Sequence, residues 1–294
     1  MIRKQIFPQP SFIPIFDNYN ILKNKNIGIT GGTGVLGKLL IDRLLRNGIS
    51  ISNYKKDITN TKSLNKWFSN NRFDLFFHLA AIVPTEKVSF DPFRAYEVNA
   101  IGSYNISKNV AQLMPNCWLF IAGSSHVYKP IIQKKKNFLD INSILDPSTF
   151  YGNTKLAGEQ ISIPLLNYFN IKFCIGRIFS FSGVGQKQPF LVPTLLDKIS
   201  KLPTQSVFKV KNGNSERDIM DVESVIDCIL HLSTLTYSGI INIGTGERRS
   251  VIDIANYLAE FLNKNIKVYS NKNNQTTDSL IADVTELKNV LKNA

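Results

Sequence analysis

The sequence predicts an α/β protein with a doubly wound parallel sheet and a smaller C-terminal lobe. Between residues 26 and 179, short apolar runs alternate with longer amphipathic stretches. Strands that alternate with helices of about 10 to 15 residues are typical of β-α-β units on a parallel sheet. After residue 180, Gly and Pro punctuate shorter segments. This change indicates a smaller lobe over the carboxyl edge of the sheet, where ligands bind in this architecture.

The apolar runs predict strands and the amphipathic stretches predict helices. Strands are expected within residues 26–30, 49–54, 73–81, 117–123 and 171–179, and helices within 34–48, 61–71, 95–113 and 151–169. Residues 1–24 are rich in Pro, Phe and Asn without a clean period, so we expect an irregular arm that packs on the body or on a partner subunit. Residues 25–180 then form the sheet domain, and residues 181–294 form mainly the smaller lobe, with segments that return to the sheet domain.

Composition indicates a globular protein, because 294 residues that are 43% hydrophobic can bury a substantial core. The three cysteines are scattered and odd in number, and no secretion signal is seen, so we expect a cytoplasmic location. The most apolar stretch, residues 75–84, is far shorter than the roughly 20 residues that a bilayer span needs. No membrane partner is therefore expected.

The formal net charge of +13 would attract a nucleic acid, an anionic membrane surface or a small ligand with several phosphates. The densest run, three lysines at residues 134–136, lacks interleaved aromatic side chains on which bases could stack. We interpret this run as a solvated loop and expect no nucleic-acid partner.

The stretch IGITGGTGVLG at residues 27–37 places four glycines within seven residues, where an apolar run turns into an amphipathic helix. Backbone N–H groups and the helix dipole at such a junction bind phosphate. Gly31 can adopt the tight turn, Gly34 lets a pyrophosphate approach the backbone, and Gly37 lets the helix pack against the strand. The G-x-x-G-x-x-G spacing therefore predicts that residues 25–180 bind a dinucleotide, and a purely structural turn is the alternative.

A second pattern combines Ser124, in SSHVY at the end of an apolar run, with Tyr151 and Lys155 of YGNTK. Residues four apart share a helix face, and an ammonium beside a phenol lowers the pKa of the phenol from its ordinary value of about 10. A tyrosine tuned in this way gives or takes a proton near neutral pH. Because Y-x-x-x-K occurs on many helices, the prediction of a catalytic site depends on its combination with Ser124 and the glycine-rich turn.

These residues together resemble the extended short-chain dehydrogenase/reductase family, in the branch that modifies nucleotide sugars. The resemblance runs from residue 26 to the C-terminus, and its further motifs are DITN (57–60), HLAA (78–81), VNAIGSYNI (98–106), YGNTKLAGE (151–159), RIFSFSGVGQ (177–186), RDIMDVESV (217–225) and INIGTGERRSV (241–251). It implies a Rossmann-type fold, an NAD(P) cofactor, a nucleotide-diphosphate sugar as substrate and a homodimer.

The resemblance implies that Tyr151 is the proton donor, that Lys155 tunes it and holds the nicotinamide ribose, and that Ser124 hydrogen-bonds the substrate carbonyl. Asn99 matches the asparagine that supports the active-site lysine, and a helix cap or a turn is its structural alternative. No metal site is expected. Besides Tyr151 and Lys155, the expected cofactor contacts are Gly31, Thr33, Gly34, Val35, Leu36, Gly37, Lys55, Asp57, Ile58, Leu79, Ala80 and Ala81.

The expected substrate contacts are Ser125, His126, Arg177, Ser180 and Arg217. Arg217 matches the arginine that binds the diphosphate of a sugar nucleotide, a task that suits a planar guanidinium. A surface ion pair with Asp218 or Asp221 is the alternative for Arg217. Ser180 stands where many relatives have Asn, and the lone imidazole of His126 fits either a substrate contact or a satisfied residue at a strand end.

The 4,6-dehydratases of this branch have an Asp-Glu pair where this chain has Ser125 and His126, so elimination of water lacks its acid and base. The compact region between NGISISNY (47–54) and KKDITN (55–60) resembles dTDP-4-dehydrorhamnose reductases, whereas FSGVGQKQPFLVP (181–193) and RDIMDVESVIDCIL (217–230) resemble GDP-4-keto-6-deoxymannose reductases. The expected reaction is therefore NAD(P)H-dependent reduction of the C4 keto group of a nucleotide-linked 4-keto-6-deoxyhexose, in deoxysugar or surface glycan biosynthesis. The alternatives are a nucleotide-sugar 4-epimerase that keeps its NAD bound and a non-catalytic module that senses dinucleotides or binds nucleic acid.

NADPH is expected to be favoured, with NAD as the other possibility. The second strand leads into Lys55 and Lys56, and no carboxylate stands at the strand end, where one would bind the ribose 2′-hydroxyl of NAD. Asp57 lies about 20 residues beyond Gly37, a separation that fits the ribose-binding acid. The DITN motif instead resembles the family's next-strand motif, whose Asp lies near the adenine, and we assign Asp57 there.

Overall fold

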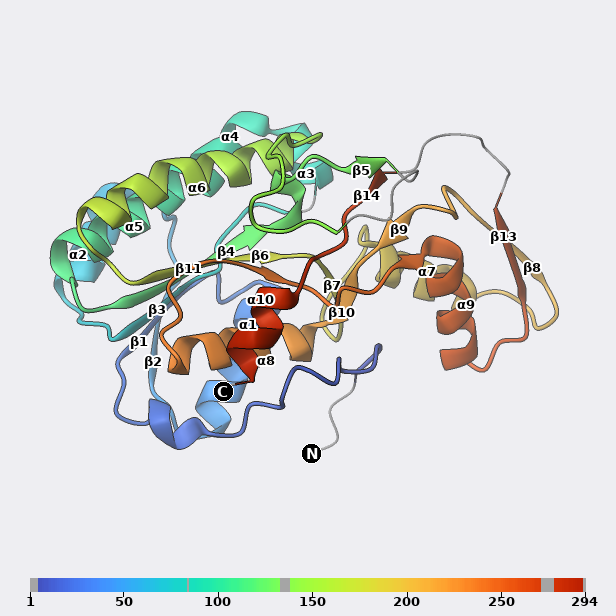
Figure 1. Ribbon diagram of the computed structural model, residues 1–294, viewed down its shortest axis with the longest axis horizontal. Coiled ribbons are helices and arrows are strands. Elements are labelled where there is room, and N and C mark those ends of the chain that lie inside the picture. The colour runs from blue at the N-terminus through green and yellow to red at the C-terminus, as the bar shows by residue number, and fades with distance from the viewer. Residues whose placement is uncertain (1–4, 84, 133–137, 271–277, 293–294) are drawn as a thin grey trace.

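The computed structural model, which describes residues 5–83, 85–132, 138–270 and 278–292, contains a central six-stranded sheet (Figure 1). The strands lie in the order β11-β6-β4-β3-β1-β2, and all neighbouring pairs are parallel. The doubly wound sheet expected from the sequence is therefore confirmed. The lysine run at residues 134–136 lies outside the described residues. The strand bounds are β1 (Ile27–Thr30), β2 (Ile51–Tyr54), β3 (Leu75–His78), β4 (Trp118–Ser124), β6 (Phe173–Ile178) and β11 (Gly239–Ile243).

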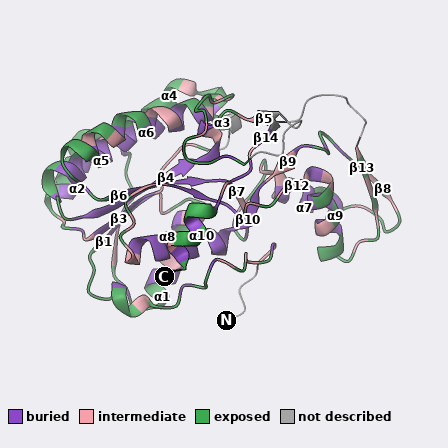
Figure 2. Cartoon of the chain, in the orientation of Figure 1, coloured by how far each residue is buried: buried purple, intermediate pink, exposed green. Residues whose placement is uncertain are grey.

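Helices cover both faces of this sheet. Phe76 and Leu119 lie in the core formed with α2, α5 and α6, whereas Phe77 and Phe120 lie in the core formed with α1, α8 and α10. This alternation follows because successive side chains of a strand point to opposite faces. Figure 2 shows the resulting buried layer between the helices. The helix bounds are α1 (Val35–Arg46), α2 (Thr61–Ser69), α5 (Gly102–Leu113), α6 (Phe150–Tyr168), α8 (Val222–Thr234) and α10 (Thr285–Leu291).

The second lobe lies on the right in Figure 1 and has an apolar core of its own. In this core, α7 (Leu191–Ser200) and α9 (Val251–Phe261) pack against each other through residues such as Leu195 and Leu258. Between its segments, α8 and β11 return to the first domain. The short strand pairs are β7 (Ser180–Ser182) with β10 (Ile219–Asp221), β8 (Val207–Val210) with β13 (Lys267–Ser270), β9 (Glu216–Arg217) with β12 (Arg249–Ser250), and β5 (Ile131–Ile132) with β14 (Asp278–Ser279).

The stretch expected to form one helix over residues 95–113 is interrupted. Helix α4 (Pro92–Tyr96) passes into a π-helical turn, η2 (Glu97–Ile101), before α5 begins. Hydrophobic periodicity does not report such a local change in winding, and π-helical turns are frequent at functional sites. The remaining short elements are η1 (Tyr19–Leu22), α3 (Thr85–Phe90) and η3 (Ser125–Val127). Across the described ranges, no helix has the length and apolar character needed to cross a membrane.

Arg177, which was expected to contact substrate, is instead part of the core. Its side chain is 2% exposed and donates to the Glu159 carboxylate at 2.8 Å, to the Tyr128 hydroxyl at 3.0 Å and to the Ile141 carbonyl at 3.1 Å. The guanidinium also lies 4.9 Å from the centroid of the Tyr128 ring. Since these partners surround the charge, the expectation of a substrate contact is corrected: Arg177 joins β6 to α6 and to the segment after β4.

We predict that Arg177→Met lowers the free energy of unfolding by about 3–5 kcal/mol, because it leaves the Glu159 carboxylate buried without its cation. Urea denaturation measures this change. Arg46→Met is the matched control, since Arg46 pairs with Asp42 on the surface, where both side chains are at least 44% exposed, and should lose no more than about 1 kcal/mol. Equal losses in the two variants would contradict the structural role of Arg177.

Candidate active site

The glycine-rich turn joins β1 to α1 with a geometry that only glycine permits. Gly31 has a φ of +79°, and a Cβ there would lie 2.5 Å from the backbone of Leu79 and Ala80. A Cβ at Gly37 would lie 2.2 Å from the Gly31 carbonyl oxygen, so the first turn of α1 packs directly against the preceding loop. The exposed Thr33 and Gly34, with the half-buried Val35 and Leu36, surround the N-terminus of α1. Because the first N–H groups of a helix lack partners within it, this junction can hold a phosphate.

Asn53 adds a polar group beside this turn. It lies in β2, and a Cβ at Gly32 would meet its amide at 2.4 Å. The Oδ1 atom of Asn53 is buried and has no hydrogen-bond partner among the described residues. A buried acceptor without a partner is costly, so a ligand that donates a hydrogen bond here would stabilise the site. The open glycine turn and this acceptor together fit a dinucleotide.

The segment after β3 lies against the glycine-rich turn. The Leu79 N–H donates to the Thr30 carbonyl at 3.1 Å, and the half-buried side chains at Leu79, Ala80 and Ala81 follow at the same edge of the sheet. Ile58 is buried, and its side chain fills the space where Gly102 would carry a Cβ. The structure therefore brings residues 79–81 to the turn, whereas Ile58 packs below the surface.

Lys55, Lys56 and Asp57 are exposed at the carboxyl end of β2. Asp57 forms an ion pair with Arg94, and its Oδ1 accepts from the Thr59 N–H at 2.9 Å. Partial desolvation opposes the shift, but these hydrogen bonds hold the pKa of Asp57 below its ordinary value. Arg94 had no role in the sequence prediction, because its partner lies 37 residues away along the chain.

Ser124 and Tyr151 meet at the carboxyl end of β4. Helix α6 begins at a Thr149 cap, whose side chain accepts from the Gly152 N–H at 3.0 Å. A Cβ at Gly152 would lie only 2.2 Å from the His126 carbonyl oxygen, so this glycine lets the helix approach η3. The approach brings the Tyr151 hydroxyl into a hydrogen bond with Ser124.

Lys155 lies one helical turn beyond Tyr151 and is 5% exposed. Burial lowers the pKa of Lys155 to about 8, although the nearby Glu159 carboxylate favours the ammonium. Burial also raises the pKa of Tyr151, and the Ser124 hydrogen bond opposes this rise only in part. The lowered phenol pKa expected from Lys155 is therefore not found in the protein alone, because desolvation outweighs the Ser124 hydrogen bond.

Asn99 connects the loop after β3 to α6. Its Oδ1 accepts from the Ile82 N–H at 2.7 Å, and its Nδ2 donates to the Thr154 hydroxyl at 2.9 Å and to the Ile82 carbonyl at 3.2 Å. The Thr154 hydroxyl in turn donates to the Tyr151 carbonyl at 2.8 Å. Asn99 thus supports the helical turn between Tyr151 and Lys155 through Thr154.

His78, the first residue of the HLAA motif, connects Thr30 to Ser103 through hydrogen bonds of its two ring nitrogens. The Ser103 hydroxyl donates its hydrogen to the Asn99 carbonyl at 2.7 Å, so its 3.0 Å contact with His78 Nε2 requires the ring to donate. His78 Nδ1 then accepts from the Thr30 hydroxyl at 2.7 Å. Burial and the Lys155 charge lower the pKa of His78 to about 3, which keeps this ring neutral.

On the substrate side, the structure brings Arg217 of the second lobe near His126. Burial lowers the pKa of His126, and the positive charge of Arg217 adds to this effect. The His126 ring is half-buried and packs edge-on against the Tyr151 ring, with centroids 5.6 Å apart. Asp218, one of the ion-pair partners considered for Arg217, accepts instead from the Thr245, Gly246 and Ala282 backbone N–H groups.

Ser125 and Ser180 differ in their access to this region. Ser125 is 3% exposed within η3, so its side chain offers little surface to a ligand. Ser180 is half-buried and pairs in the β7–β10 ladder with Ile219, which lies two residues after Arg217. Among the predicted substrate residues, His126, Ser180 and Arg217 therefore remain candidates by position.

Similar proteins carry several activities. UDP-glucuronic acid decarboxylase 5 of Arabidopsis thaliana is 25% identical over 315 residues, which cover 97% of this chain and 89% of that protein. A putative UDP-glucose 4-epimerase of Methanocaldococcus jannaschii is 25% identical over 77% of this chain and 79% of its own length. A dTDP-4-dehydrorhamnose reductase of Mycolicibacterium smegmatis is 28% identical over 46% of this chain and 41% of its own length.

Solved structures share the fold. RMD from Pseudomonas aeruginosa, complexed with NADPH, superposes with a TM-score of 0.80 at 19% identity, over 92% of this chain and 93% of that one. The UDP-glucose 4-epimerase of Thermus thermophilus, in complex with NAD, gives a TM-score of 0.75 at 19% identity, over 89% of this chain and 91% of that one.

The NAD-dependent epimerase/dehydratase family matches residues 27–244. The matched region includes the glycine-rich turn, Ser124, Tyr151, Lys155 and Arg217. Since this match covers more than half of the 294 residues, the chain belongs to the NAD-dependent epimerase/dehydratase family.

Proposed function

We propose that this protein reduces the C4 keto group of a nucleotide-linked 4-keto-6-deoxyhexose with NAD(P)H. The observation that carries the proposal is the hydrogen bond between Ser124 and Tyr151, one helical turn from Lys155. The side chain that packs beside this pair is the His126 ring and not a carboxylate. The pair can hold and protonate a carbonyl oxygen. Because Ser125 and His126 stand where the dehydratases have an Asp-Glu pair, the site lacks the acid and the base that elimination of water needs.

In this mechanism the bound nicotinamide supplies the hydride that reaches C4. The Ser124 hydroxyl holds the carbonyl oxygen, which fixes its orientation and stabilises the charge that develops on it. The Tyr151 hydroxyl donates its proton to this oxygen, so the ketone becomes an alcohol and the phenol becomes a phenolate. The Lys155 ammonium, one turn away on the same helix, favours the phenolate until solvent returns a proton.

Arg217 provides the substrate side of the site, where we assign it to the diphosphate of the nucleotide sugar. A guanidinium binds phosphate oxygens with two parallel hydrogen bonds, and Arg217 lies near enough to His126 to affect its pKa. This position supports a substrate that extends from Tyr151 into the second lobe. The product would serve deoxysugar or surface glycan biosynthesis.

A nucleotide-sugar 4-epimerase is the second candidate, and the similarity to UDP-glucose 4-epimerases supports it. Such an enzyme uses the same tyrosine and serine but returns the hydride to its substrate and retains its cofactor. The reductase is favoured by Lys55 and Lys56 at the end of β2, because these cations suit the 2′-phosphate of NADPH, a reductant that is consumed.

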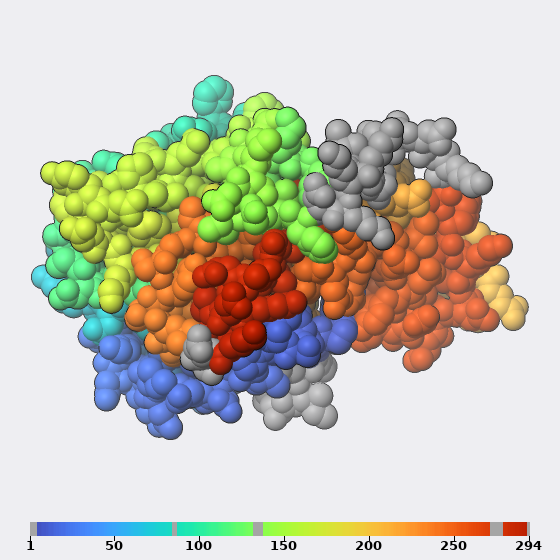
Figure 3. Space-filling view, in the orientation of Figure 1, coloured from blue at the N-terminus to red at the C-terminus, as the bar shows by residue number. Residues whose placement is uncertain are grey.

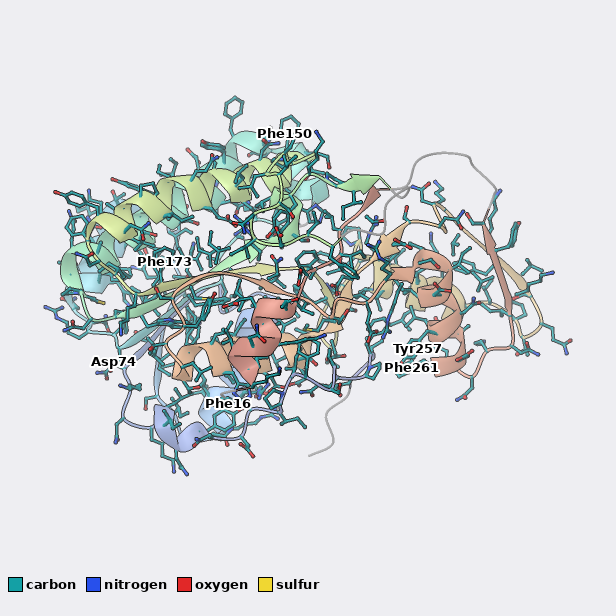
Figure 4. All side chains as sticks on the ribbon, viewed as in Figure 1. Phe16, Asp74, Phe150, Phe173, Tyr257 and Phe261 are labelled. Carbon is teal, nitrogen blue, oxygen red and sulfur yellow. The ribbon has the colours of Figure 1, made fainter. Side chains whose placement is uncertain are left out.

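We also propose a cytoplasmic homodimer. The three cysteines are buried free thiols, which fits a reducing compartment. Large apolar side chains are exposed on α3, α4 and α6, including Phe90 at 92%, Phe93 at 86% and Phe150 at 62%, and Figure 4 labels Phe150 at the start of α6. Exposed apolar groups of this size favour a protein interface.

We predict that NADPH is consumed when the protein meets a GDP-, dTDP-, CDP- or UDP-linked 4-keto-6-deoxy sugar, and absorbance at the nicotinamide band measures the consumption. UDP-glucose and UDP-glucuronic acid serve as the comparison substrates. Conversion of UDP-glucose to its 4-epimer without added cofactor would establish the epimerase instead. Release of carbon dioxide from UDP-glucuronic acid would establish a decarboxylase.

We predict that Tyr151→Phe lowers kcat by about 100-fold or more, the scale expected for loss of a general acid, while NADPH affinity changes little. Stopped-flow turnover and fluorescence titration of NADPH measure the two quantities. Tyr237→Phe is the matched control, since it removes a hydroxyl that donates to the Ile240 carbonyl at 3.4 Å near the amino end of β11, at the edge of the sheet opposite Ser124. Near-normal turnover of Tyr151→Phe would remove this residue from the mechanism.

We predict that the wild type prefers NADPH to NADH by about 10-fold, as expected if one phosphate contact contributes about 1.4 kcal/mol. Lys55→Ala or Lys56→Ala should reduce this preference, and steady-state kinetics with both cofactors measures it. Lys172→Ala, also exposed and just before the amino end of β6, at the edge of the sheet opposite the glycine-rich turn, is the control for the loss of one surface charge. Equal use of NADH by the wild type, or NAD that copurifies with it, would support the epimerase.

A further inference from the structure

Residues 5–24, which we call the arm, lie outside the residues matched by the family and contact both lobes. Figure 3 shows the arm along the lower edge of the molecule, reaching from the first domain to the second lobe. Phe7 is 1% exposed in the core of the second lobe, whereas Ile13, Phe16 and Leu22 lie in the core beneath the main sheet. The arm therefore contributes to both cores, as β10 does through Ile219 and Met220.

The first end of the arm supports the ribbon that carries Arg217. The Phe7 ring stacks on Tyr257 of α9, with centroids 5.3 Å apart, and the Arg249 guanidinium lies 5.4 Å from the centroid of Phe7. Arg249 is the register partner of Arg217 in the antiparallel β12–β9 pair. A shift of the Phe7 ring would therefore be transmitted through one strand pair to Arg217.

The same end of the arm also holds the other side of the Arg217 segment. Asp221 is 0% exposed, and its Oδ2 accepts from the Ile6 N–H at 2.7 Å and from the Phe7 N–H at 3.4 Å. Its Oδ1 accepts from the Glu223 N–H at 3.0 Å, which caps α8. Arg217 and Asp221 are four residues apart, so the arm fixes the segment between them from two directions.

The second end of the arm is anchored on the first domain. The Phe16 N–H donates to Asp227 Oδ1 at 3.0 Å, and the same oxygen accepts from Arg43 of α1 at 2.7 Å. The Phe16 ring packs against His231 of α8 with centroids 5.0 Å apart. Figure 4 labels Phe16 and Tyr257, the two ends of this path, well apart in the molecule. The first domain therefore supplies a fixed base for the arm.

We propose that the arm is a positioning element of the substrate site: it holds the 217–221 segment so that Arg217 points at the diphosphate of the nucleotide sugar. This inference rests on the proposed function, because it takes Arg217 as the diphosphate contact. Arm residues act through Arg249 and Asp221 and touch neither substrate nor cofactor. Weakening the first end of the arm should thus reduce affinity for the nucleoside diphosphate and spare the dinucleotide.

We predict that Phe7→Ala in the full chain raises the Kd of a nucleoside diphosphate by about 10-fold, a change of a size typical of coupled neighbours. The Kd of NADPH should change by less than about 2-fold, because the glycine-rich turn lies outside these contacts. Isothermal titration with GDP, dTDP, CDP and UDP identifies the one that binds the wild type, and this nucleotide is then used for all variants.

The matched control is Phe16→Ala, which removes the same buried side chain at the second end of the arm but keeps the backbone N–H that anchors this end to Asp227. It should lower the melting temperature as Phe7→Ala does but leave both Kd values within about 2-fold. Where Phe7→Ala does not fold, Tyr257→Phe removes only the hydrogen bond to the Ile6 carbonyl and should raise the nucleotide Kd by about 3-fold. Unchanged nucleotide affinity in the folded variant, or an equal loss in Phe16→Ala, would overturn the proposal.

Arg217→Ala separates this inference from the proposed function. If Arg217→Ala weakens the nucleoside diphosphate strongly but the arm variant does not, the arm proposal alone fails. If no nucleoside diphosphate binds the wild type, or if Arg217→Ala binds it as tightly as the wild type, the assignment of Arg217 fails and the arm proposal falls with it.

Discussion

A line of buried hydrogen bonds across the carboxyl ends of β1 and β3 fixes the distance between the glycine-rich turn and Tyr151, the proposed proton donor. It begins at Thr30, passes through the neutral ring of His78 and continues to Asn99. Asn99 then donates to the Thr154 hydroxyl of α6, which in turn donates to the Tyr151 carbonyl. The hydroxyl and imidazole donors in this line each have one acceptor that their neighbours leave available, and Asn99 Nδ2 donates to both Thr154 and Ile82. No member can therefore rotate without leaving a buried polar group unpaired. The proposed dinucleotide site and the helix that carries the proposed proton donor are therefore held at a fixed separation.

Burial sets the protonation of the groups next to this line of hydrogen bonds, Tyr151 and Lys155. Glu159 is shared, since its carboxylate pairs with Arg177 at 2.8 Å and also favours the ammonium of Lys155. Without that carboxylate, desolvation would lower the pKa of Lys155 further below about 8. Tyr151 has no comparable counter-charge, and its pKa is raised. The pKa values of Tyr151 and Lys155 therefore depend on burial and on neighbouring groups, and not on the Y-x-x-x-K spacing alone. The Arg177–Glu159 ion pair is one of these neighbours.

Local features of the site could be predicted from the sequence, because they depend on short stretches of chain. The spacing of Gly31, Gly34 and Gly37 reports a backbone conformation directly, and the alternation of apolar runs reports the sheet. Arg177 and Arg217 could not be told apart in this way, since both stand in family motifs. Their roles differ because the partners of Arg177 lie 18 and 49 residues away. The same limit hid the contacts of the arm, although the arm itself was expected, because its contact with Asp221 spans 214 residues.

The choice between the proposed reductase and the epimerase depends on how firmly the outer end of the cofactor would be held, because both proposed reactions use Ser124, Tyr151 and Lys155. At the carboxyl end of β2 the groups are exposed lysines and an aspartate engaged by Arg94. Exposed charges are screened by salt and contribute little each, whereas a buried carboxylate on the ribose hydroxyls would retain the cofactor more strongly. The proposed attachment through exposed cations would therefore suit a dinucleotide that leaves after each turnover, which is the behaviour that the proposed reductase requires.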